Sequence, residues 1–440
     1  MIVQSITDLI GNTPLLKIPK SVHGLENIDL YAKLELFNPW GSVKDRTAWG
    51  ILQPHLVHLP YKKVIESSSG NTAKGLQMIA SLHKSSVHAI TNRIRVSEEK
   101  AILQLLGTKI TELPGKSDCF DPNDPQDPVM YIQREIADHP DQYIHSDQYF
   151  NDNNRQVHFE TTGKEIEQDL EKVDYFIGGL GTTGSTLGTA QRLKASNGSL
   201  IAVGVVAESE DFIPGIRTQD EVMEVGLFQP SFYNKILTVS SSQAIERMLQ
   251  LIRNVGLLAG PTTGASLEGA IQYLQPIDTA LTKRQTAVMI ACDRVEWYIS
   301  YIQSRRPDLF GSEAQTSWQD KLNEEVLFND AHQLAALDAL NWISQKKGIV
   351  IDLRQEISYK LGHLAGSINI PFEILDKQLN ITVPFCTHLP LLFLCPIGKK
   401  SKMIANFLQS KEIEAYSIEG GFTAWKNANL PYERDVLVCE

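Results

Sequence analysis

The sequence predicts an α/β protein built on mainly parallel sheets, followed by a second, smaller α/β domain. Between residues 28 and 302, short β-rich runs alternate with segments of helical spacing, which is the pattern of βαβ units. A polar stretch then interrupts this pattern, and the alternation starts again after it. The length of 440 residues also favours two domains, because a single core rarely grows beyond about 250–300 residues.

Each expected strand of the first part is a β-branched or apolar run that precedes a helical segment. Strands are expected at residues 29–34, 64–66, 87–90, 109–113, 175–177, 201–206 and 286–291. Helices are expected at residues 72–83, 97–106, 157–170, 242–256 and 266–274. This alternation predicts a mainly parallel sheet.

A polar segment separates the two predicted domains. Residues 303–328 are rich in polar and charged side chains, and we expect them to link a domain of residues 1–302 to one of residues 329–440, with room for a helix after Trp318. In the second domain, strands are expected at 348–353, 391–394 and 415–418, and a helix at 400–410.

The composition excludes several classes of protein. A net charge of −11 argues against nucleic acid or an anionic membrane as a partner. No stretch approaches the ~20 apolar residues that a membrane helix needs. Residues 1–15 contain Asp8 and lack the pattern of a secretory signal, so the predicted compartment is the cytoplasm.

The cysteines do not form a recognisable disulfide or metal pattern. They are odd in number, with no CxxC pair and no Cys/His ligand spacing. We therefore expect no disulfides and no metal site, and at least one reduced thiol. The five are Cys119, Cys292, Cys386, Cys395 and Cys439.

Lys44 occupies an unusual position for a structural lysine. It follows a turn marked by Pro39 and Gly41, and it should stand at the opening of a helix that continues through Thr47. The positive end of the helix dipole disfavours a cation there. A neutral amine is what Schiff-base chemistry requires. Taken alone, a solvated surface lysine would be the simpler interpretation, but two later loops change it.

The first of these loops lies between the strand at 64–66 and the following helix. It offers hydroxyls, an amide side chain and backbone N–H groups that converge on one point, which suits a carboxylate or a phosphate. Capping the helix would need only one such residue. The residues concerned are Ser68, Ser69, Gly70, Asn71 and Thr72.

The second loop, residues 178–185, also follows a strand and opens a helix. Gly179, Gly181 and Gly184 satisfy G-x-G-x-x-G, and Glu208 lies where a dinucleotide fold has its ribose-binding acid. By itself, this loop leaves a dinucleotide and a simple phosphate both open. The segment 260–265 opens a further helix, and a turn with an N-cap is its simplest role.

Five motifs follow one another along the first part of the chain: IGNTPL at 10–15, GSVKDR at 41–46, SSGNT at 68–72, GTTGS at 181–185 and GPTTG at 260–264. In this order they resemble the cysteine synthase and cystathionine β-synthase family, whose members are pyridoxal phosphate (PLP) enzymes of fold type II. The resemblance covers roughly residues 1–302 and implies two α/β subdomains with mainly parallel sheets.

The resemblance implies a role for each matched residue. Lys44 would hold the cofactor aldehyde as an internal aldimine and act as the base. Asn71 would bond the ring hydroxyl. Thr262 would face the pyridine nitrogen, where a neutral hydroxyl favours β-elimination through an aminoacrylate. The cofactor phosphate would be bound by Gly181, Thr182, Thr183, Gly184 and Ser185, and the substrate carboxylate by Ser68, Ser69, Gly70 and Thr72, with Gln148 near it.

The chain departs from the family pattern at several positions. Trp40 replaces an expected small residue, Thr183 replaces an expected glycine, and NDNN follows Gln148 at residues 151–154. Arg217 lies where the family lines the mouth of the substrate site. An arginine there could select a phosphorylated over an acetylated serine, although a surface role is equally consistent with the sequence.

Cys395 lies in a loop between the predicted strand at 391–394 and a helix, beside Lys399 and Lys400. Backbone N–H groups, the helix dipole and the two lysines each stabilise a thiolate. A buried and inert cysteine is the alternative.

Residues 329–440 contain four further motifs: VIDLR at 350–354, GHLAGSINIP at 362–371, CPIGKKS at 395–401 and EGGFTAW at 419–425. With these motifs, this part of the chain resembles the rhodanese family, in which the cysteine matching Cys395 carries a persulfide. Asp352 and His363 match positions with mainly structural roles in that family.

The two resemblances together predict an enzyme that performs β-replacement on O-acetyl- or O-phospho-L-serine. The nucleophile would be sulfide or a persulfide on Cys395, and the product L-cysteine or a close relative. The expected partners are small molecules and a second copy of the chain in a homodimer, with no nucleic acid and no membrane.

Three alternatives stay open. One is β-replacement by a nitrogen nucleophile, as in a diaminopropionate synthesis, with the rhodanese domain as a sensor. Another is a dinucleotide-dependent dehydrogenase, which would leave Lys44 without a role. The third is an inactive PLP domain that serves as a scaffold. Cystathionine synthesis is disfavoured, because the sequence shows neither a haem-binding extension nor tandem regulatory repeats.

Overall fold

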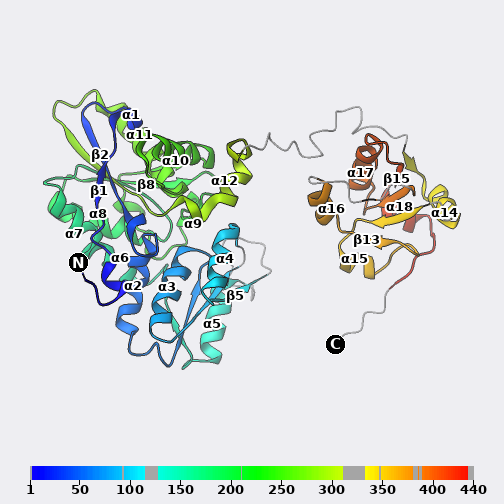
Figure 1. Cartoon of the computed structure of the whole chain (residues 1–440), viewed down its shortest axis with the longest axis horizontal. Helices are drawn as coiled ribbons and strands as arrows, with labels where there is room; N and C mark the ends of the chain where they lie inside the picture. Colours follow the sequence, from blue (N-terminus) through cyan, green and yellow to red (C-terminus); the bar gives the residue numbers. More distant parts are fainter. Residues whose placement is uncertain are drawn as a thin grey trace. The chain divides into compact units, whose positions relative to one another are not determined.

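The computed structural model describes residues 2–91, 94–113, 127–209, 211–310, 332–345, 348–379, 385 and 389–434. The chain divides into two compact units, Met1–Arg306 and Pro307–Glu440, each with its own sheets and helices (Figure 1). None of the helices in the described ranges has the length and apolar character needed to cross a membrane.

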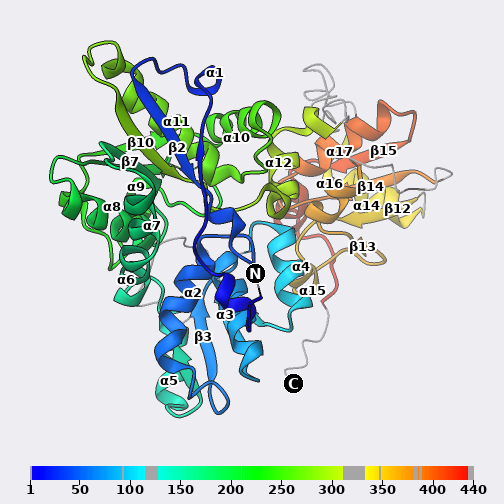
Figure 2. The ribbon, with the colours of Figure 1, turned by 60° about the vertical axis from the view of Figure 1, so that its left-hand side comes forward.

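The larger sheet of the first unit has six strands in the order β1-β2-β10-β7-β8-β9. Only the pair β1–β2 is antiparallel. Figure 2 shows α10 and α11 on one side of this sheet and α7 and α8 on the other. The strands are β1 (Leu15–Lys17), β2 (Ile28–Lys33), β7 (Tyr175–Gly179), β8 (Ile201–Ala207), β9 (Lys235–Val239) and β10 (Gln285–Ile290).

The helices of this part are α1 (Lys20–His23), α7 (Thr162–Asp169), α8 (Gly184–Ser196), α9 (Gln219–Val222), α10 (Ser241–Val255), α11 (Pro261–Asp278) and α12 (Ile299–Arg305). The 3-10 turns are η1 (Ile6–Leu9), η2 (Glu35–Phe37), η4 (Pro230–Phe232) and η5 (Val295–Tyr298), whereas η6 (Pro307–Phe310) begins the second unit. With helices on both faces, the central strands are apolar on both sides, as a buried parallel sheet requires.

A second sheet lies between β2 and β7 in the sequence. Its four strands are all parallel, in the order β5-β4-β3-β6. They are β3 (Lys63–Ser67), β4 (Val87–Thr91), β5 (Lys109–Glu112) and β6 (Tyr143–His145). The helices are α2 (Lys44–Leu52), α3 (Asn71–Leu82), α4 (Ser97–Leu105), α5 (Pro128–Asp138) and α6 (Asp152–Glu160), with the turn η3 (Gln53–His55).

The second unit contains one five-stranded parallel sheet in the order β11-β15-β14-β12-β13. Its core holds Phe393 and Trp425, both almost fully buried. The strands are β11 (Gln333–Leu334), β12 (Ile349–Asp352), β13 (Ile368–Asn369), β14 (Leu391–Leu394) and β15 (Ala415–Ile418). The helices are α14 (Ala336–Ser344), α15 (Glu356–Lys360), α16 (Phe372–Leu379), α17 (Lys399–Gln409) and α18 (Gly421–Asn427).

The predicted α/β architecture with mainly parallel sheets is confirmed, and several details differ. Strands β1, β6 and β9 of the first unit and β11 and β13 of the second were not expected. The helix expected at 157–170 is two helices, because the chain leaves helical geometry at Thr161 (φ −117°, ψ −73°), where two threonines and a glycine have low helix propensity. Residues 303–305, expected in the linker, end α12. The segment after Trp318 lies outside the described residues.

Candidate active site

A cavity of about 800 Å³ in the first unit gathers residues from both sheets. The loops after β3 and β7 contribute to it, as expected for a ligand site at the carboxyl ends of parallel strands. Among the residues predicted for this site, Gly184 does not line the cavity; it is the first residue of α8. The other predicted residues of this unit all line the cavity: Lys44, Ser68, Ser69, Gly70, Asn71, Thr72, Gln148, Gly181, Thr182, Thr183, Ser185, Arg217 and Thr262.

Lys44 is the first residue of α2 and is partly buried in the cavity wall. Its backbone N–H donates to Ser42 Oγ at 3.2 Å. Burial lowers the pKa of the Lys44 amine, and the neighbouring Cys292 and Asp293 oppose this shift without reversing it. The lowered pKa therefore has burial as its main cause, where the sequence argument relied on the helix dipole.

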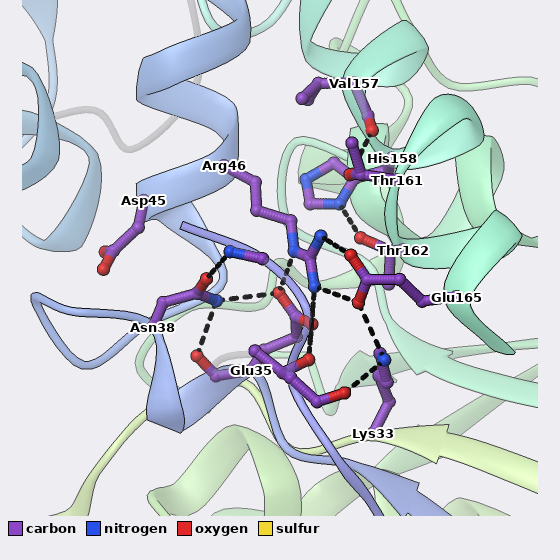
Figure 3. A network of polar contacts seen from close by, with 12 residues as sticks. Lys33, Glu35, Asn38, Asp45, Arg46, Val157, His158, Thr161, Thr162 and Glu165 are labelled. Atoms are coloured by element: carbon purple, nitrogen blue, oxygen red, sulfur yellow. Dashed lines mark hydrogen bonds and ion pairs between the residues drawn. The ribbon is translucent and has the colours of Figure 1, made fainter. Parts of the chain in front are cut away.

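Arg46, two residues after Lys44, anchors α2 to neighbouring segments (Figure 3). Its guanidinium donates to both carboxylate oxygens of Glu35, at 2.7 and 2.8 Å, and to both of Glu165, at 2.6 and 2.7 Å. Lys33 pairs with Glu165 at 2.8 Å, and Thr13 donates to Glu35 at 2.7 Å. This network fixes the start of α2 against β2, η2 and α7.

Gln148 holds the loop of residues 68–72 through two hydrogen bonds. Thr72 Oγ1 donates to Gln148 Oε1 at 2.6 Å, and Gln148 Nε2 donates to the carbonyl oxygen of Ser67 at 3.0 Å. Ser68 Oγ accepts the backbone N–H of Ala73 at 3.3 Å. Because both ends of its amide are engaged with the protein, Gln148 supports the loop in this structure.

Asn71 is bound by two residues that the sequence analysis did not identify. Its Nδ2 donates to Asp293 Oδ2 at 2.8 Å and to Tyr298 OH at 3.0 Å. Tyr298 in turn donates to Asp293 Oδ2. Asp293 lies just beyond the carboxyl end of β10, which is where ligand-contacting residues gather in such sheets. Its place after a predicted strand could therefore have identified it from the sequence.

The loop of residues 181–185 forms a tight cradle at the N-terminus of α8. A Cβ at Gly181 would lie 2.4 Å from the carbonyl oxygen of Gly215, and one at Gly184 would lie 2.4 Å from Asn154 Oδ1. Thr183 Oγ1 is buried and has no hydrogen-bond partner. A helix N-terminus with a spare hydroxyl donor suits an anion.

Thr262 and Arg217 line other parts of the cavity wall. The Thr262 hydroxyl donates to the carbonyl oxygen of Pro214. The Arg217 guanidinium lies 4.8 Å from the centre of the Tyr149 ring. Burial acts to lower the pKa of Arg217, but Tyr149 and the nearby Glu221 and Glu224 give a net rise, so this guanidinium is charged and has acidic neighbours.

Residues 6–293 match the family model described as "Pyridoxal-phosphate dependent enzyme", which is more than half of the chain. The chain belongs to this family. Residues 335–428 match the model of the rhodanese-like domain. This PLP-dependent enzyme therefore carries a C-terminal rhodanese-like domain, and its glycine-rich loop at 178–185 belongs to a PLP fold and not to a dinucleotide fold.

Within this family, the sequence is similar to cysteine synthases and cystathionine beta-synthases. A cysteine synthase of Aquifex aeolicus is 31% identical over 283 residues, which are 62% of this chain and 84% of the relative. A cystathionine beta-synthase of Apis mellifera is 31% identical over 320 residues, which are 68% of this chain but only 61% of the relative.

Solved structures show the same fold. A hydrogen sulfide-producing enzyme from Fusobacterium nucleatum aligns with a TM-score of 0.60 and 28% identity, over 68% of this chain and 100% of that one. An O-acetylserine dependent cystathionine beta-synthase from Helicobacter pylori aligns with a TM-score of 0.59 and 25% identity, over 68% and 98%. The predicted family, fold type II, cofactor and β-replacement class are thus confirmed.

The cavity fits this cofactor. It presents an amine of lowered pKa at Lys44, an amide at Asn71, and an anion cradle at 181–185 with an unpartnered hydroxyl on Thr183. These groups match the aldehyde, ring hydroxyl and phosphate of PLP. The role of each individual residue remains a prediction.

Cys395 begins the loop that leads into α17 in the second unit and is 1% exposed. Its sulfur accepts the backbone N–H of Ser401 at 3.4 Å and the Ser401 hydroxyl at 3.3 Å. Ser417 Oγ lies 2.9 Å from Ser401 Oγ. The low exposure fits the buried cysteine that the sequence left open as an alternative, and the role of Cys395 stays a prediction. Cys119, Cys386 and Cys439 lie outside the described residues.

Asp352 and His363 pack within the second unit. Asp352 is buried and pairs with Arg354, whose Nη2 also donates to the carbonyl oxygen of Gly362 at 2.6 Å. The His363 ring stacks on Tyr359 with centroids 4.1 Å apart. Both residues thus make packing contacts of the kind that the sequence analysis expected.

Proposed function

We propose that the enzyme replaces the β-substituent of O-acetyl- or O-phospho-L-serine with sulfur and releases L-cysteine or a close relative. The observation that carries this proposal is the single cavity in which Lys44, the loop 68–72 and the loop 181–185 meet. Relatives named cysteine synthase and a structure described as O-acetylserine dependent support the choice of substrate and nucleophile.

PLP, when bound, supplies the electron sink that stabilises negative charge at the substrate α-carbon. Lys44 is proposed to hold the cofactor aldehyde and, once released by the substrate, to take the α-proton at Nζ. Burial lowers the pKa of this amine, which favours the neutral form that a base requires.

The loop 68–72 is proposed to bind the substrate carboxylate through its hydroxyls and backbone N–H groups. Gln148 keeps this loop in place through its hydrogen bonds to Thr72 and Ser67. The loop 181–185 is proposed to bind the cofactor phosphate at the N-terminus of α8. Substrate and cofactor would thus be oriented from the two sheets.

The sulfur is proposed to come from sulfide or from a persulfide on Cys395. In the second route, the outer sulfur of the persulfide attacks the β-carbon and the leaving group departs with its electron pair. The product is then a disulfide between Cys395 and the new cysteine. A thiol reductant must supply two electrons to release it.

An absorbance titration tests the first half of the proposal. Purified enzyme should show a visible cofactor band that disappears in Lys44→Ala. Addition of O-acetyl-L-serine or O-phospho-L-serine should shift this band, and sulfide should restore it. Arg217→Gln should weaken the response to the phosphorylated substrate only, if that is the one used. A Lys44-dependent band that neither substrate shifts would rule out this substrate class.

Cys395→Ser tests the persulfide route separately. The variant should keep the sulfide-dependent rate and lose the rate with thiosulfate, whose outer sulfur is transferred to the Cys395 thiolate as sulfite leaves. Equal rates in wild type and variant with every sulfur donor would exclude the transfer from Cys395 and leave the sulfide route intact.

A further inference from the structure

Asp293 joins the three segments that carry the proposed cofactor contacts. Its backbone forms an antiparallel bridge with Ser42, two residues before Lys44. Its carbonyl oxygen accepts the N–H of Gly260, two residues before Thr262, at 2.9 Å. Its side chain binds Asn71. With 3% exposure, the residue is buried at the centre of this arrangement.

The side chain of Asp293 lies in a closely fitted site. Oδ2 accepts from Asn71 Nδ2 and from Tyr298 OH, while Oδ1 is buried and has no hydrogen-bond partner. A Cβ on Gly260 would lie 2.3 Å from Oδ1 and 3.0 Å from the Tyr298 ring. Only glycine at position 260 leaves room for this carboxylate.

Several ionisable groups face Asp293. One of them is Lys74, whose Nζ is buried without a hydrogen-bond partner and lies 4.0 Å from the centre of the Trp297 ring. Burial raises the pKa of Asp293 to about 6 and that of Glu99 to about 8. The carboxyl of Asp293 is therefore more readily ionised than that of Glu99. The facing groups are Lys44, Lys74, Glu99, Cys292 and Tyr298.

We propose that Asp293 is a positioning residue that fixes the Asn71 amide against the cofactor ring and keeps a negative charge in the wall of the cavity that Lys44 also lines. This inference rests on the proposed role of Lys44. An opposite charge nearby favours the protonated form of a nitrogen. When PLP is held by Lys44, Asp293 would therefore raise the pH at which the Lys44 nitrogen loses its proton.

The test is a pH titration of the visible cofactor band in the full-length holoenzyme. Asp293→Asn keeps the shape of the side chain and removes its charge, so the midpoint should fall by about one pH unit or more. Asp45→Asn is the matched control. Asp45 is a buried carboxylate next to Lys44 in sequence, but it binds Trp40 N–H and Ser42 Oγ and does not line the cavity. The midpoint of the cofactor band in Asp45→Asn should equal that of the wild type.

Tyr298→Phe provides a second variant in case Asp293→Asn does not retain PLP. It keeps the carboxylate but removes one hydrogen bond to it and one constraint on Asn71. The midpoint should fall by less than in Asp293→Asn, and PLP should dissociate faster.

The two levels of the inference fail differently. A band that persists in Lys44→Ala overturns the proposed role of Lys44. A Lys44-dependent band with the same midpoint in Asp293→Asn as in wild type overturns the role of Asp293 alone. If only Tyr298→Phe can be measured, an unchanged midpoint and an unchanged rate of PLP release overturn it.

Discussion

At the scale of single residues, Thr183 has an unfavourable backbone conformation. Its φ is +64°, in the left-handed region that glycine adopts easily and β-branched residues rarely do. Its hydroxyl is buried without a partner. Such strain at a predicted phosphate loop suggests that stability is lost here in exchange for a contact with the cofactor.

Thr183→Gly should therefore stabilise the cofactor-free protein and weaken PLP binding. Relief of the strain should raise the free energy of unfolding by about 1 kcal/mol, measured by urea denaturation after PLP removal. Loss of the hydroxyl should raise the dissociation constant of PLP. Thr183→Ala is the control, because it removes the hydroxyl but keeps the strained Cβ. A glycine variant less stable than wild type without PLP would contradict this interpretation.

At the scale of elements, the network around Arg46 holds α2, β2, η2 and α7 together. Arg46 and Glu35 are almost fully buried, and the Glu165 side chain is 13% exposed. Removing one partner from a buried ion pair leaves an uncompensated charge, which is far more costly than losing a surface pair.

Glu165→Gln should lower the free energy of unfolding by about 3 kcal/mol, measured by urea denaturation at pH 7. Glu167→Gln, on the same helix, is the control, because Glu167 and its partner Arg192 are each about 30% exposed. This variant should lose less than about 1 kcal/mol. Equal losses in both variants would show that the buried network has no special weight.

The stability that Glu165 contributes should also depend on pH. Although burial acts in the opposite direction, Arg46 and Lys33 lower the pKa of Glu165 to about 2, from 4.5. A lowered folded-state pKa gives stability that is present above pH 4.5 and is lost as the pH falls toward 2. The difference in stability between wild type and Glu165→Gln should shrink over this range in urea denaturation. A constant difference would contradict the assignment.

Contiguous elements were predictable from the sequence, and contacts between distant segments were not. The loops 68–72 and 181–185 each concentrate their polar residues in one short string after a strand, so their chemistry is visible locally. Asp293 and Tyr298 are single residues whose role depends on the fold bringing them to Asn71, more than 220 positions away. Strands β1 and β6 have only three residues each, too few for a clear alternation pattern.

At the scale of the whole molecule, two units with separate apolar cores should fold independently of each other. A chain ending at Phe310 should fold, bind PLP and keep the sulfide-dependent rate of the full-length protein within about twofold. Its PLP content and steady-state rate can be measured beside those of full-length Cys395→Ser. Failure of the shortened chain to bind PLP would show that the first unit depends on the second.

The strand order of the larger sheet also bears on how the protein is made. β10 is the last strand of that sheet to leave the ribosome, yet it lies in the middle, between β2 and β7. Until residues 285–290 emerge, β2 and β7 each expose an edge with unpaired backbone groups. Nascent chains that stop before this point therefore present two unpaired strand edges, which are prone to aggregation.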